Sequence, residues 1–390
     1  MGMKVNVAVC GRFHYHNYVR YLAKLGTLNR FYYSHKLSTD SAALGISKEQ
    51  AVNLWAKEYL LGINGRLTRG RLVPEMAAWY ANLWQAGVLR RWDQCDILHL
   101  MLHGAGLEVA RRAKSEGSVV VAEPVNQHVE AAHAIVEEER EALGLKATGG
   151  LCRVEQRQIE EAEVSDFLLA PSRVVRDSFV KRGYDARRIA VLPYGVDTDR
   201  FRPLDGRDEL SAERPFRVLC VAQISMRKGH VYLLEAWKRL ALPNSELLLI
   251  GALSNEMEPI LDRYAGMFRH ISGVANATLR DYYGRASVFV LPSLEDGCAA
   301  VCAEAMACGV PVITTSSNGS SEIMDHGKDG FVVPARSSEA IAECLERLYR
   351  DEDLRREMSV AALAKARSKL TWEVYASNLN EVYRAVLDRC

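Results

Sequence analysis

Short apolar runs alternate with longer helical patterns along most of this chain, and this alternation restricts the fold more than any other feature. It is typical of βα units, in which parallel strands form a sheet that helices cover. The runs form two sets, at residues 5–9, 31–33, 96–100, 118–121, 166–170 and 189–192, and then at 217–221, 246–250, 270–271, 288–291, 310–314 and 330–333. The sequence therefore predicts an α/β fold with two parallel sheets.

A stretch without apolar periodicity separates the two sets. Residues 194–215 are rich in glycine, proline and charged side chains, as is usual between domains. The chain has 390 residues, whereas a single hydrophobic core stops growing at roughly 250 to 300. We therefore expect an N-terminal domain at 1–195 and a C-terminal domain at 196–370, followed by a helical segment at 371–390.

The composition restricts the class of protein. The chain has 50 basic and 49 acidic residues, and its net charge of +1 argues against a general nucleic-acid binder. The first residues hold only a short apolar stretch, too short for a signal peptide, and no run reaches the roughly 18 apolar residues of a membrane span. The 9 cysteines lie scattered, without a CxxC pair or a histidine at zinc-site spacing. We therefore expect reduced, buried thiols, no metal site and a cytoplasmic protein.

Residues 55–93 differ in composition from the rest of the chain. Six basic residues are interleaved there with aromatic side chains, and three acidic residues oppose them. The segment contains Trp55, Trp79, Tyr80, Trp84 and Trp92 among Lys57, Arg66, Arg69, Arg71, Arg90 and Arg91. One interpretation is peripheral contact with a membrane surface or with an anionic acceptor. The other is an insertion whose tryptophans fill a core and whose arginines are solvated.

The segment 224–230 is a candidate phosphate-binding loop. It follows a predicted strand and precedes a predicted helix at 231–240. Ser225, Arg227 and Lys228 place one hydroxyl and two cations beside the amino end of that helix, which suits a diphosphate. The alternative is an ordinary helix start with exposed cations.

A second candidate loop follows the strand that ends at Leu291. Gly297 lies in this loop and a helix is predicted from about Ala299, so free backbone N–H groups are expected beside a carboxylate. Asp296 and Glu304 can line one cleft at the carboxyl end of the sheet. The alternative is a helix-capping aspartate and a surface glutamate.

Four segments in this order, 170–172, 192–197, 221–237 and 296–313, resemble the retaining glycosyltransferases of family 4. The resemblance extends from about residue 165 to 390. It implies a GT-B fold, with two Rossmann-like domains that face a central cleft. The nucleotide sugar would bind the C-terminal domain and the acceptor mainly the N-terminal domain. It also implies a last helix, at 371–390, that crosses back to the N-terminal domain.

The family pattern assigns roles on the C-terminal side. Arg227 and Lys228 would stabilise the diphosphate leaving group without a metal, and Glu304 would accept hydrogen bonds from the nucleotide ribose. Asp296 would face the donor sugar, although many members have glutamate there, and Gln223 stands where many have arginine. Other expected substrate contacts are Ser225, Val274 beside the base, and the backbone of Gly297, Cys298, Ala299, Ala300 and Val301.

On the N-terminal side, Gly11 and Arg12 are expected near the donor phosphates. Their loop has one glycine where many members of the family have two. His128 resembles a functional histidine at the cleft, and Glu123 or Asn126 are alternatives for that role. We therefore predict Lys228, Asp296 and His128 as the catalytic residues. His14 and His16 are further candidates for acceptor or phosphate contact, or else turn residues.

The resemblance implies a retaining hexosyltransferase that uses a UDP- or GDP-sugar as co-substrate, with no cofactor and no metal. The acceptor would be a glycan or a lipid-linked glycan in bacterial cell-surface glycan assembly, of the lipopolysaccharide or exopolysaccharide type. Such an enzyme would be cytoplasmic, with peripheral contact to the inner membrane face through 55–93. The alternatives are a degenerate nucleotide-sugar-binding subunit and an epimerase or phosphorylase, because the fold alone does not determine the reaction.

Overall fold

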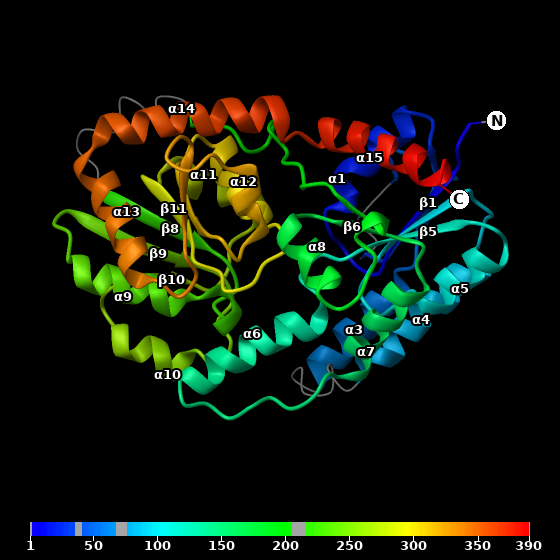
Figure 1. Ribbon diagram of the computed structural model, residues 1–390, viewed down its shortest axis with the longest axis horizontal. Helices are drawn as coiled ribbons and strands as arrows, with labels where there is room; N and C mark the ends of the chain where they lie inside the picture. The colour runs from blue at the N-terminus through cyan, green and yellow to red at the C-terminus, as the bar shows by residue number, and fades with distance from the viewer. Residues whose placement is uncertain (1, 36–40, 68–75, 205–214, 390) are drawn as a thin grey trace.

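The computed structural model describes residues 2–35, 41–67, 76–204 and 215–389, and within these ranges the chain forms two α/β domains (Figure 1). Each domain contains one sheet, with seven strands in the N-terminal domain and six in the C-terminal domain. Every strand pair is parallel. The predicted pair of parallel sheets is therefore confirmed.

The N-terminal sheet is built from β1 (Val5–Val9), β2 (Leu28–Tyr33), β3 (Ala51–Asn53), β4 (Ile97–Met101), β5 (Val119–Glu123), β6 (Phe167–Ala170) and β7 (Ile189–Val191). The helices are α1 (Tyr15–Lys24), α2 (Ser41–Leu44), α3 (Ala56–Leu67), α4 (Ala77–Arg90), α5 (Leu107–Ser115), α6 (Val129–Ala142), α7 (Arg153–Val164), α8 (Arg173–Val180) and the 3₁₀ turn η1 (Ala186–Arg188). The strands β1, β4 and β5 are buried along their whole length, as expected of strands with helices on both faces.

The C-terminal sheet is built from β8 (Phe216–Val221), β9 (Ser245–Ile250), β10 (Arg269–Ile271), β11 (Val288–Leu291), β12 (Val312–Thr315) and β13 (Gly330–Val333). Its helices and 3₁₀ turns are η3 (Met226–Lys228), α9 (His230–Leu240), α10 (Glu258–Leu261), η4 (Asp262–Tyr264), η5 (Asn276–Thr278), α11 (Leu279–Gly284), α12 (Ala300–Ala307), η6 (Gly319–Ile323), α13 (Ser338–Arg350) and α14 (Glu352–Lys369), and the final helix is α15 (Trp372–Leu387).

The order of the strands indicates at which edge of each sheet a ligand would bind. They are β3-β2-β1-β4-β5-β6-β7 and β10-β9-β8-β11-β12-β13, so the order reverses between β1 and β4 and between β8 and β11. In open α/β sheets, ligands bind at the carboxyl ends of the strands that flank such a reversal. Both predicted loops of the C-terminal domain, after β8 and after β11, lie at this point.

One strand of the described chain, β3, was not predicted from the sequence. It has three residues, all half-buried, and it pairs at the edge of the sheet, where Ala51 aligns with Phe31. A run this short has no apolar alternation to detect.

The last helix leaves the C-terminal domain and packs against the N-terminal domain. In Figure 1 the red helix α15 lies beside the blue helix α1, and the two are in contact. Trp372, Tyr375 and Tyr383 of α15 are buried in one cluster with Tyr15 and Tyr18 of α1. None of the described helices has the length and apolar composition needed to cross a membrane.

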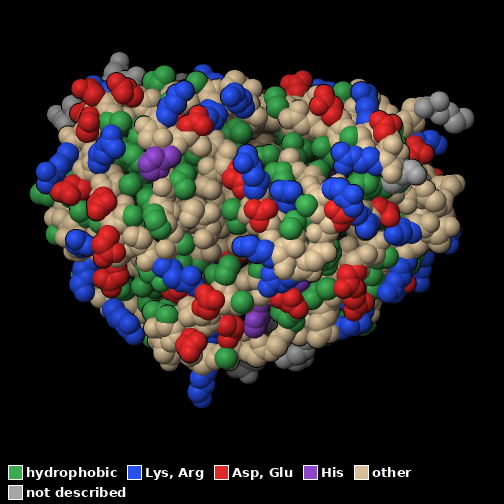
Figure 2. Space-filling view, viewed as in Figure 1, with side chains coloured by type: hydrophobic (Ala, Val, Ile, Leu, Met, Phe, Trp, Pro, Cys, Tyr) green, Lys and Arg blue, Asp and Glu red, His purple; other side chains and the backbone are tan. Residues whose placement is uncertain are grey.

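Charged side chains of both signs are interspersed over the face seen in Figure 2. This mixture agrees with the nearly balanced composition of 50 basic and 49 acidic residues. A broad field of one sign is the usual footprint of a nucleic-acid-binding face, and the face in Figure 2 does not have one.

Candidate active site

The loop after β8 is shaped by a glycine that cannot be replaced without strain. Ser225 precedes the single turn η3, and Gly229 then begins α9 with φ +65°, in the left-handed region that favours glycine. A Cβ at Gly229 would lie 2.1 Å from the carbonyl oxygen of Pro292. The loop that carries Arg227 and Lys228 is therefore pressed against the loop after β11.

Two consecutive cations of the first loop pair with two consecutive acids of the second. Arg227 Nη1 lies 3.0 Å from Glu295 Oε2, and Lys228 Nζ forms an ion pair with Asp296 Oδ2. Glu295 is fully buried, and this burial raises the pKa of its carboxyl group even though Arg227 opposes the shift. The structure thus brings Arg227, Lys228 and Asp296 together at the carboxyl ends of β8 and β11.

Sequence reasoning missed Glu295, although it is the partner of Arg227. The available signal was the adjacency of Glu295 and Asp296, because two neighbouring acids in one predicted loop matched two neighbouring cations in the other. Glu295 also accepts a hydrogen bond from the backbone N–H of Gln127, at 2.9 Å from Oε1. This carboxylate therefore joins the cation loop to the N-terminal domain.

The loop after β11 continues into the contact between the two domains. The carbonyl oxygen of Gly297 accepts a hydrogen bond from Ser172 Oγ at 2.7 Å. A Cβ at Gly297 would lie 1.9 Å from the carbonyl oxygen of Val125, so only glycine fits between the domains. Of the residues that follow, Cys298 and Ala299 are buried, Ala300 is exposed and Val301 is half-buried.

Glu304 lies one turn inside α12 and pairs with a tyrosine. Its Oε2 accepts a hydrogen bond from Tyr283 Oη at 2.9 Å. Burial raises the pKa of Glu304 to about 7, although the Tyr283 hydrogen bond and the charge of Arg200 lower it. A carboxyl group of this kind changes charge near neutral pH, and Tyr283 and Arg200 were not predicted as part of the site. Val274 is half-buried in the loop between β10 and η5.

His128 caps α6 and lines a cavity of about 200 Å³ in the N-terminal domain. Its Nδ1 accepts a hydrogen bond from the backbone N–H of Glu130 at 3.4 Å, and its ring packs edge-on against Phe179. Burial, and then the charge of Arg182, lowers the pKa of His128 to about 4, so the imidazole is neutral at pH 7. The cavity is also lined by Phe13, His103, Asn126, Gln127 and Gln158.

The loop between β1 and α1 approaches the same cavity. Gly11 has φ +132°, where L side chains are strained, and Phe13 lines the cavity with its ring 5.5 Å from that of His103. Arg12 is exposed on this loop. The loop therefore brings Gly11 and Arg12 to the carboxyl edge of the N-terminal sheet.

Two other candidates, Glu123 and His14, face the protein interior. Glu123 is fully buried, and its carboxylate oxygens lie 2.6 Å from His14 Nε2 and 2.9 Å from His99 Nε2. His99 Nδ1 in turn lies 2.5 Å from Tyr383 Oη on α15. Burial raises the pKa of Glu123, but the two histidines outweigh it and hold that pKa far below its usual range. This network joins the sheet to α15, and His128 rather than Glu123 reaches the cavity.

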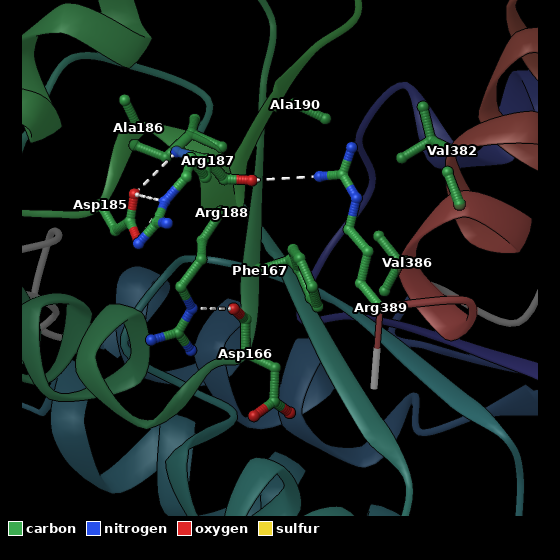
Figure 3. Close-up of a pocket in the computed structure, with 12 residues that line it drawn as sticks. Asp166, Phe167, Asp185, Ala186, Arg187, Arg188, Ala190, Val382, Val386 and Arg389 are labelled. Atoms are coloured by element: carbon green, nitrogen blue, oxygen red, sulfur yellow. Dashed lines mark hydrogen bonds and ion pairs between the residues drawn. The ribbon is translucent and has the colours of Figure 1, made fainter.

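A larger hollow, of about 940 Å³, lies at the amino ends of β6 and β7 beside α15 (Figure 3). Its cations are held by groups of the same chain. Arg187 pairs with Asp185, Arg188 Nε donates to the carbonyl oxygen of Asp166 at 2.6 Å, and Arg389 Nη1 donates to the carbonyl oxygen of Arg187 at 3.1 Å. The predicted residues of the N-terminal domain, Gly11, Arg12 and His128, lie at the opposite edge of this sheet, so we do not place the site here.

The described residues contain no group of three or more His, Cys, Asp or Glu side chains that could hold a metal ion. The cysteines of the loop after β11 and of α12 and its end, Cys298, Cys302 and Cys308, are buried. Burial raises the pKa of Cys298 to about 11, as expected of a packed thiol.

Comparison with known proteins relates the C-terminal domain to a family. The family model described as glycosyl transferases group 1 matches residues 202–365, which include both loops of the site. Residues 202–365 of the chain thus resemble the group 1 glycosyltransferases.

The chain is also similar to individual glycosyltransferases that act on phosphatidylinositol mannosides and on inositol phosphate, by their names. It is 31% identical, over 56% of its length and 62% of the relative, to a GDP-mannose-dependent alpha-(1-6)-phosphatidylinositol monomannoside mannosyltransferase of Mycobacterium tuberculosis. It is 30% identical, over 65% of its length and 66% of the relative, to a D-inositol 3-phosphate glycosyltransferase of Corynebacterium jeikeium. The match to the first of these relatives thus spans 62% of that protein's length.

Solved structures confirm the GT-B fold of the chain. Sucrose-phosphate synthase from Thermosynechococcus elongatus superposes with a TM-score of 0.68 over 100% of both chains, at 17% identity. HepE from Anabaena, in complex with UDP and glucose, superposes with a TM-score of 0.67 over 98% of this chain and 100% of that one, at 15% identity. At these identities the likeness shows the fold alone.

Proposed function

We propose that this protein is a retaining hexosyltransferase that transfers a sugar from a nucleoside diphosphate sugar to a hydroxyl group of an acceptor. The observation that carries the proposal is the convergence of Arg227, Lys228 and Asp296 between β8 and β11. Relatives in the group 1 family support it, since one is GDP-mannose-dependent by name. A UDP-sugar is the other donor that we propose to test.

Two cations supply the chemistry that a departing diphosphate needs. When the bond between the anomeric carbon and the β-phosphate oxygen breaks, its electron pair stays on that oxygen. Arg227 and Lys228 would stabilise the new charge, and they are already held in place by Glu295 and Asp296. Preorganised charges of this kind cost no reorganisation during the reaction. This chemistry requires no metal ion in our proposal.

The acceptor oxygen would attack on the face from which the diphosphate leaves, which retains the configuration. Its proton would pass to a phosphate oxygen of the leaving group, so the protein mainly positions the reactants. His128 is neutral and lines the cavity of the N-terminal domain, where it could orient the acceptor hydroxyl. Glu304 would accept hydrogen bonds from the ribose, and Asp296 would contact the donor sugar.

We further propose a glycan or lipid-linked acceptor in bacterial cell-surface glycan assembly, used by a cytoplasmic enzyme in peripheral contact with the membrane. The acceptor named for one relative is a phosphatidylinositol monomannoside, which is a membrane lipid. The basic and aromatic composition of 55–93 supports contact with an anionic surface.

Nucleotide binding provides the first test. Calorimetric titration with UDP, GDP and ADP in the presence of EDTA should show binding of one nucleotide, and magnesium should not strengthen it. Lys228→Ala should abolish that binding and lower turnover by orders of magnitude. Lys238→Ala removes the same charge from an exposed position on α9 and is the matched control. Absence of binding to all three nucleotides would overturn the proposal in favour of a protein without transferase activity.

A further inference from the structure

The exposed apolar side chains of this protein are concentrated on one part of the N-terminal domain. Seven large apolar side chains between residues 55 and 89 are exposed: Trp55, Tyr59, Leu60, Ile63, Leu67, Trp79 and Leu89. The other described residues contribute Phe13, Leu25, Met267 and Val360. Scattered exposed apolar residues need no explanation, whereas a cluster of them marks an interaction site.

Four of the seven form a stripe along α3. Trp55, Tyr59, Ile63 and Leu67 are spaced by four residues, a spacing that places side chains on one face of a helix. The exposed fraction is 43% for Trp55, 52% for Ile63 and 80% for Leu67, so the stripe faces solvent along its length. The rings of Trp55 and Tyr59 lie 5.3 Å apart, edge to face.

The opposite side of α3 is attached to the carboxyl edge of the sheet. Lys57 Nζ lies 3.3 Å from Cys10 Sγ, directly after β1, and 2.8 Å from Glu58 Oε1. Ser34 Oγ, directly after β2, donates to Glu58 Oε1 at 2.8 Å. The exposed stripe is therefore held beside the edge that carries Gly11 and Arg12.

The two interpretations of 55–93 apply to different residues of the segment. Trp84 of α4 is 1% exposed and belongs to the core, and Trp92 is half-buried with its Nε1 donating to Glu116 at 2.7 Å. Trp79, at the start of α4, is 48% exposed like Trp55. Arg69 and Arg71 lie outside the described residues. In Figure 1, α3 lies at the lower edge of the N-terminal domain beside α4.

We propose that the outer face of α3, with Trp79, docks onto the surface of an anionic lipid membrane. Tryptophan and tyrosine combine an apolar body with a polar edge, and they favour the boundary between acyl chains and head groups. Arg66 of α3, Arg90 at the end of α4 and Arg91 directly after it are exposed and complement an anionic surface, whereas the whole chain is nearly neutral. A lipid surface fits this combination of an apolar stripe and a local excess of basic residues.

Docking through this face would bring the acceptor side of the cleft to the membrane. The carboxyl ends of β1 and β2, to which α3 is attached, are on the same edge of the sheet as the cavity of His128. This inference rests on the proposed function for the acceptor that it would deliver, but lipid binding itself does not require turnover.

Vesicle co-sedimentation of the purified chain tests the proposal. The chain should bind vesicles of phosphatidylcholine mixed with phosphatidylglycerol, bind pure phosphatidylcholine more weakly, and lose affinity as salt is raised. The double variant Ile63→Glu, Leu67→Glu should bind the anionic vesicles about tenfold more weakly or worse, because two apolar side chains no longer enter the interface. Val360→Glu places the same charge at a 69% exposed position on α14, and it should bind as the unaltered chain does.

Three outcomes would overturn the docking proposal. The first is recovery of the unaltered chain only in the supernatant, and the second is binding of the double variant as strong as that of the Val360→Glu control. The third is a size-exclusion result in which the unaltered chain is a dimer and the double variant is a monomer. The last result would assign the face to contact between copies of the chain. Nucleotide calorimetry on the same variants tests the proposed function separately from the docking proposal. A variant that no longer binds vesicles but binds nucleotide normally leaves the proposed function intact. Thermal unfolding of each variant checks that it is folded.

Discussion

Glu139, on α6 of the N-terminal domain, accepts a hydrogen bond from Arg336 Nε of the C-terminal domain at 3.0 Å. Tyr232 Oη donates to the same carboxylate, also at 3.0 Å, and Glu139 is only 2% exposed. Arg336 has a φ of 62°, which is uncommon for a residue other than glycine. A buried carboxylate between two domains is stable only while its donors stay in place. This contact therefore fixes how the domains meet below the cleft.

Removal of this carboxylate charge should loosen the contact between the domains. Glu139→Gln leaves Arg336 without its charged buried partner, and we expect a loss of about 1 kcal/mol because Arg336 is partly exposed. Thermal unfolding should show a lower midpoint, and small-angle scattering a larger radius of gyration. Glu138→Gln is the control, since its exposed carboxylate lies 3.4 Å from Arg336. Equal effects of the two variants would contradict the assignment.

Addition of one methyl group at Gly297 should separate the cleft loops. The Cβ of Gly297→Ala would lie 1.9 Å from the backbone oxygen of Val125, and backbone cannot rotate away as a side chain can. We expect turnover to fall by about two orders of magnitude, because misplacement of about 1 Å is enough for such a loss. The measurements are kcat and the radius of gyration. Gly150→Ala, where nothing lies within 4 Å of the new Cβ, should change neither quantity.

Nucleotide affinity should depend on the charge of Glu304. Its pKa is raised to about 7, so the carboxyl group is partly protonated at neutral pH. A raised carboxyl pKa means that its contribution to folding stability is complete below about pH 4.5 and is lost as the pH rises through about 7. In the complex, ribose hydroxyls that donate hydrogen bonds to the ionised carboxylate would offset the free-energy cost of ionising it in a buried position. Affinity should therefore increase from pH 6 to pH 8.

Calorimetry at several pH values checks this prediction, with Glu304→Gln as the comparison. The amide does not titrate, so the difference in binding free energy between the two proteins isolates the contribution of Glu304 from that of the nucleotide phosphates. A constant difference across the pH range would show that Glu304 does not contact the ribose.

Substitution of His128 should lower the rate of transfer to the acceptor and leave binding of the donor nucleotide unchanged. Its pKa of about 4 keeps the imidazole neutral above pH 5, so the variant His128→Asn removes a neutral hydrogen-bonding group. We expect kcat to fall by about 10²- to 10⁴-fold, the range that one positioned polar group contributes, with nucleotide affinity unchanged. His133→Asn, on the same helix, is the control. An equal loss of nucleotide binding in His128→Asn would move this residue to the donor side.

Much of the fold could be predicted because its signals are local. Each predicted strand overlaps an observed one, since a buried parallel strand is a short continuous apolar run between helical patterns. The loops with Arg227, Lys228 and Asp296 were recognisable because a strand, a glycine and a helix start follow one another within a few residues. Their meeting follows from the strand order, in which β8 and β11 are neighbours.

Sequence alone determined the two parallel sheets and the two loops whose charged residues meet at the carboxyl edge of the second sheet. Tertiary structure alone decided that Glu123 is held by His14 and His99 inside the core, and that Glu295 is the partner of Arg227. It also decided which tryptophans of 55–93 face solvent. The physical reason is distance along the chain. Periodicity reports how a residue relates to its near neighbours, whereas pairing across 68 residues, as between Arg227 and Glu295, depends on how separate elements pack.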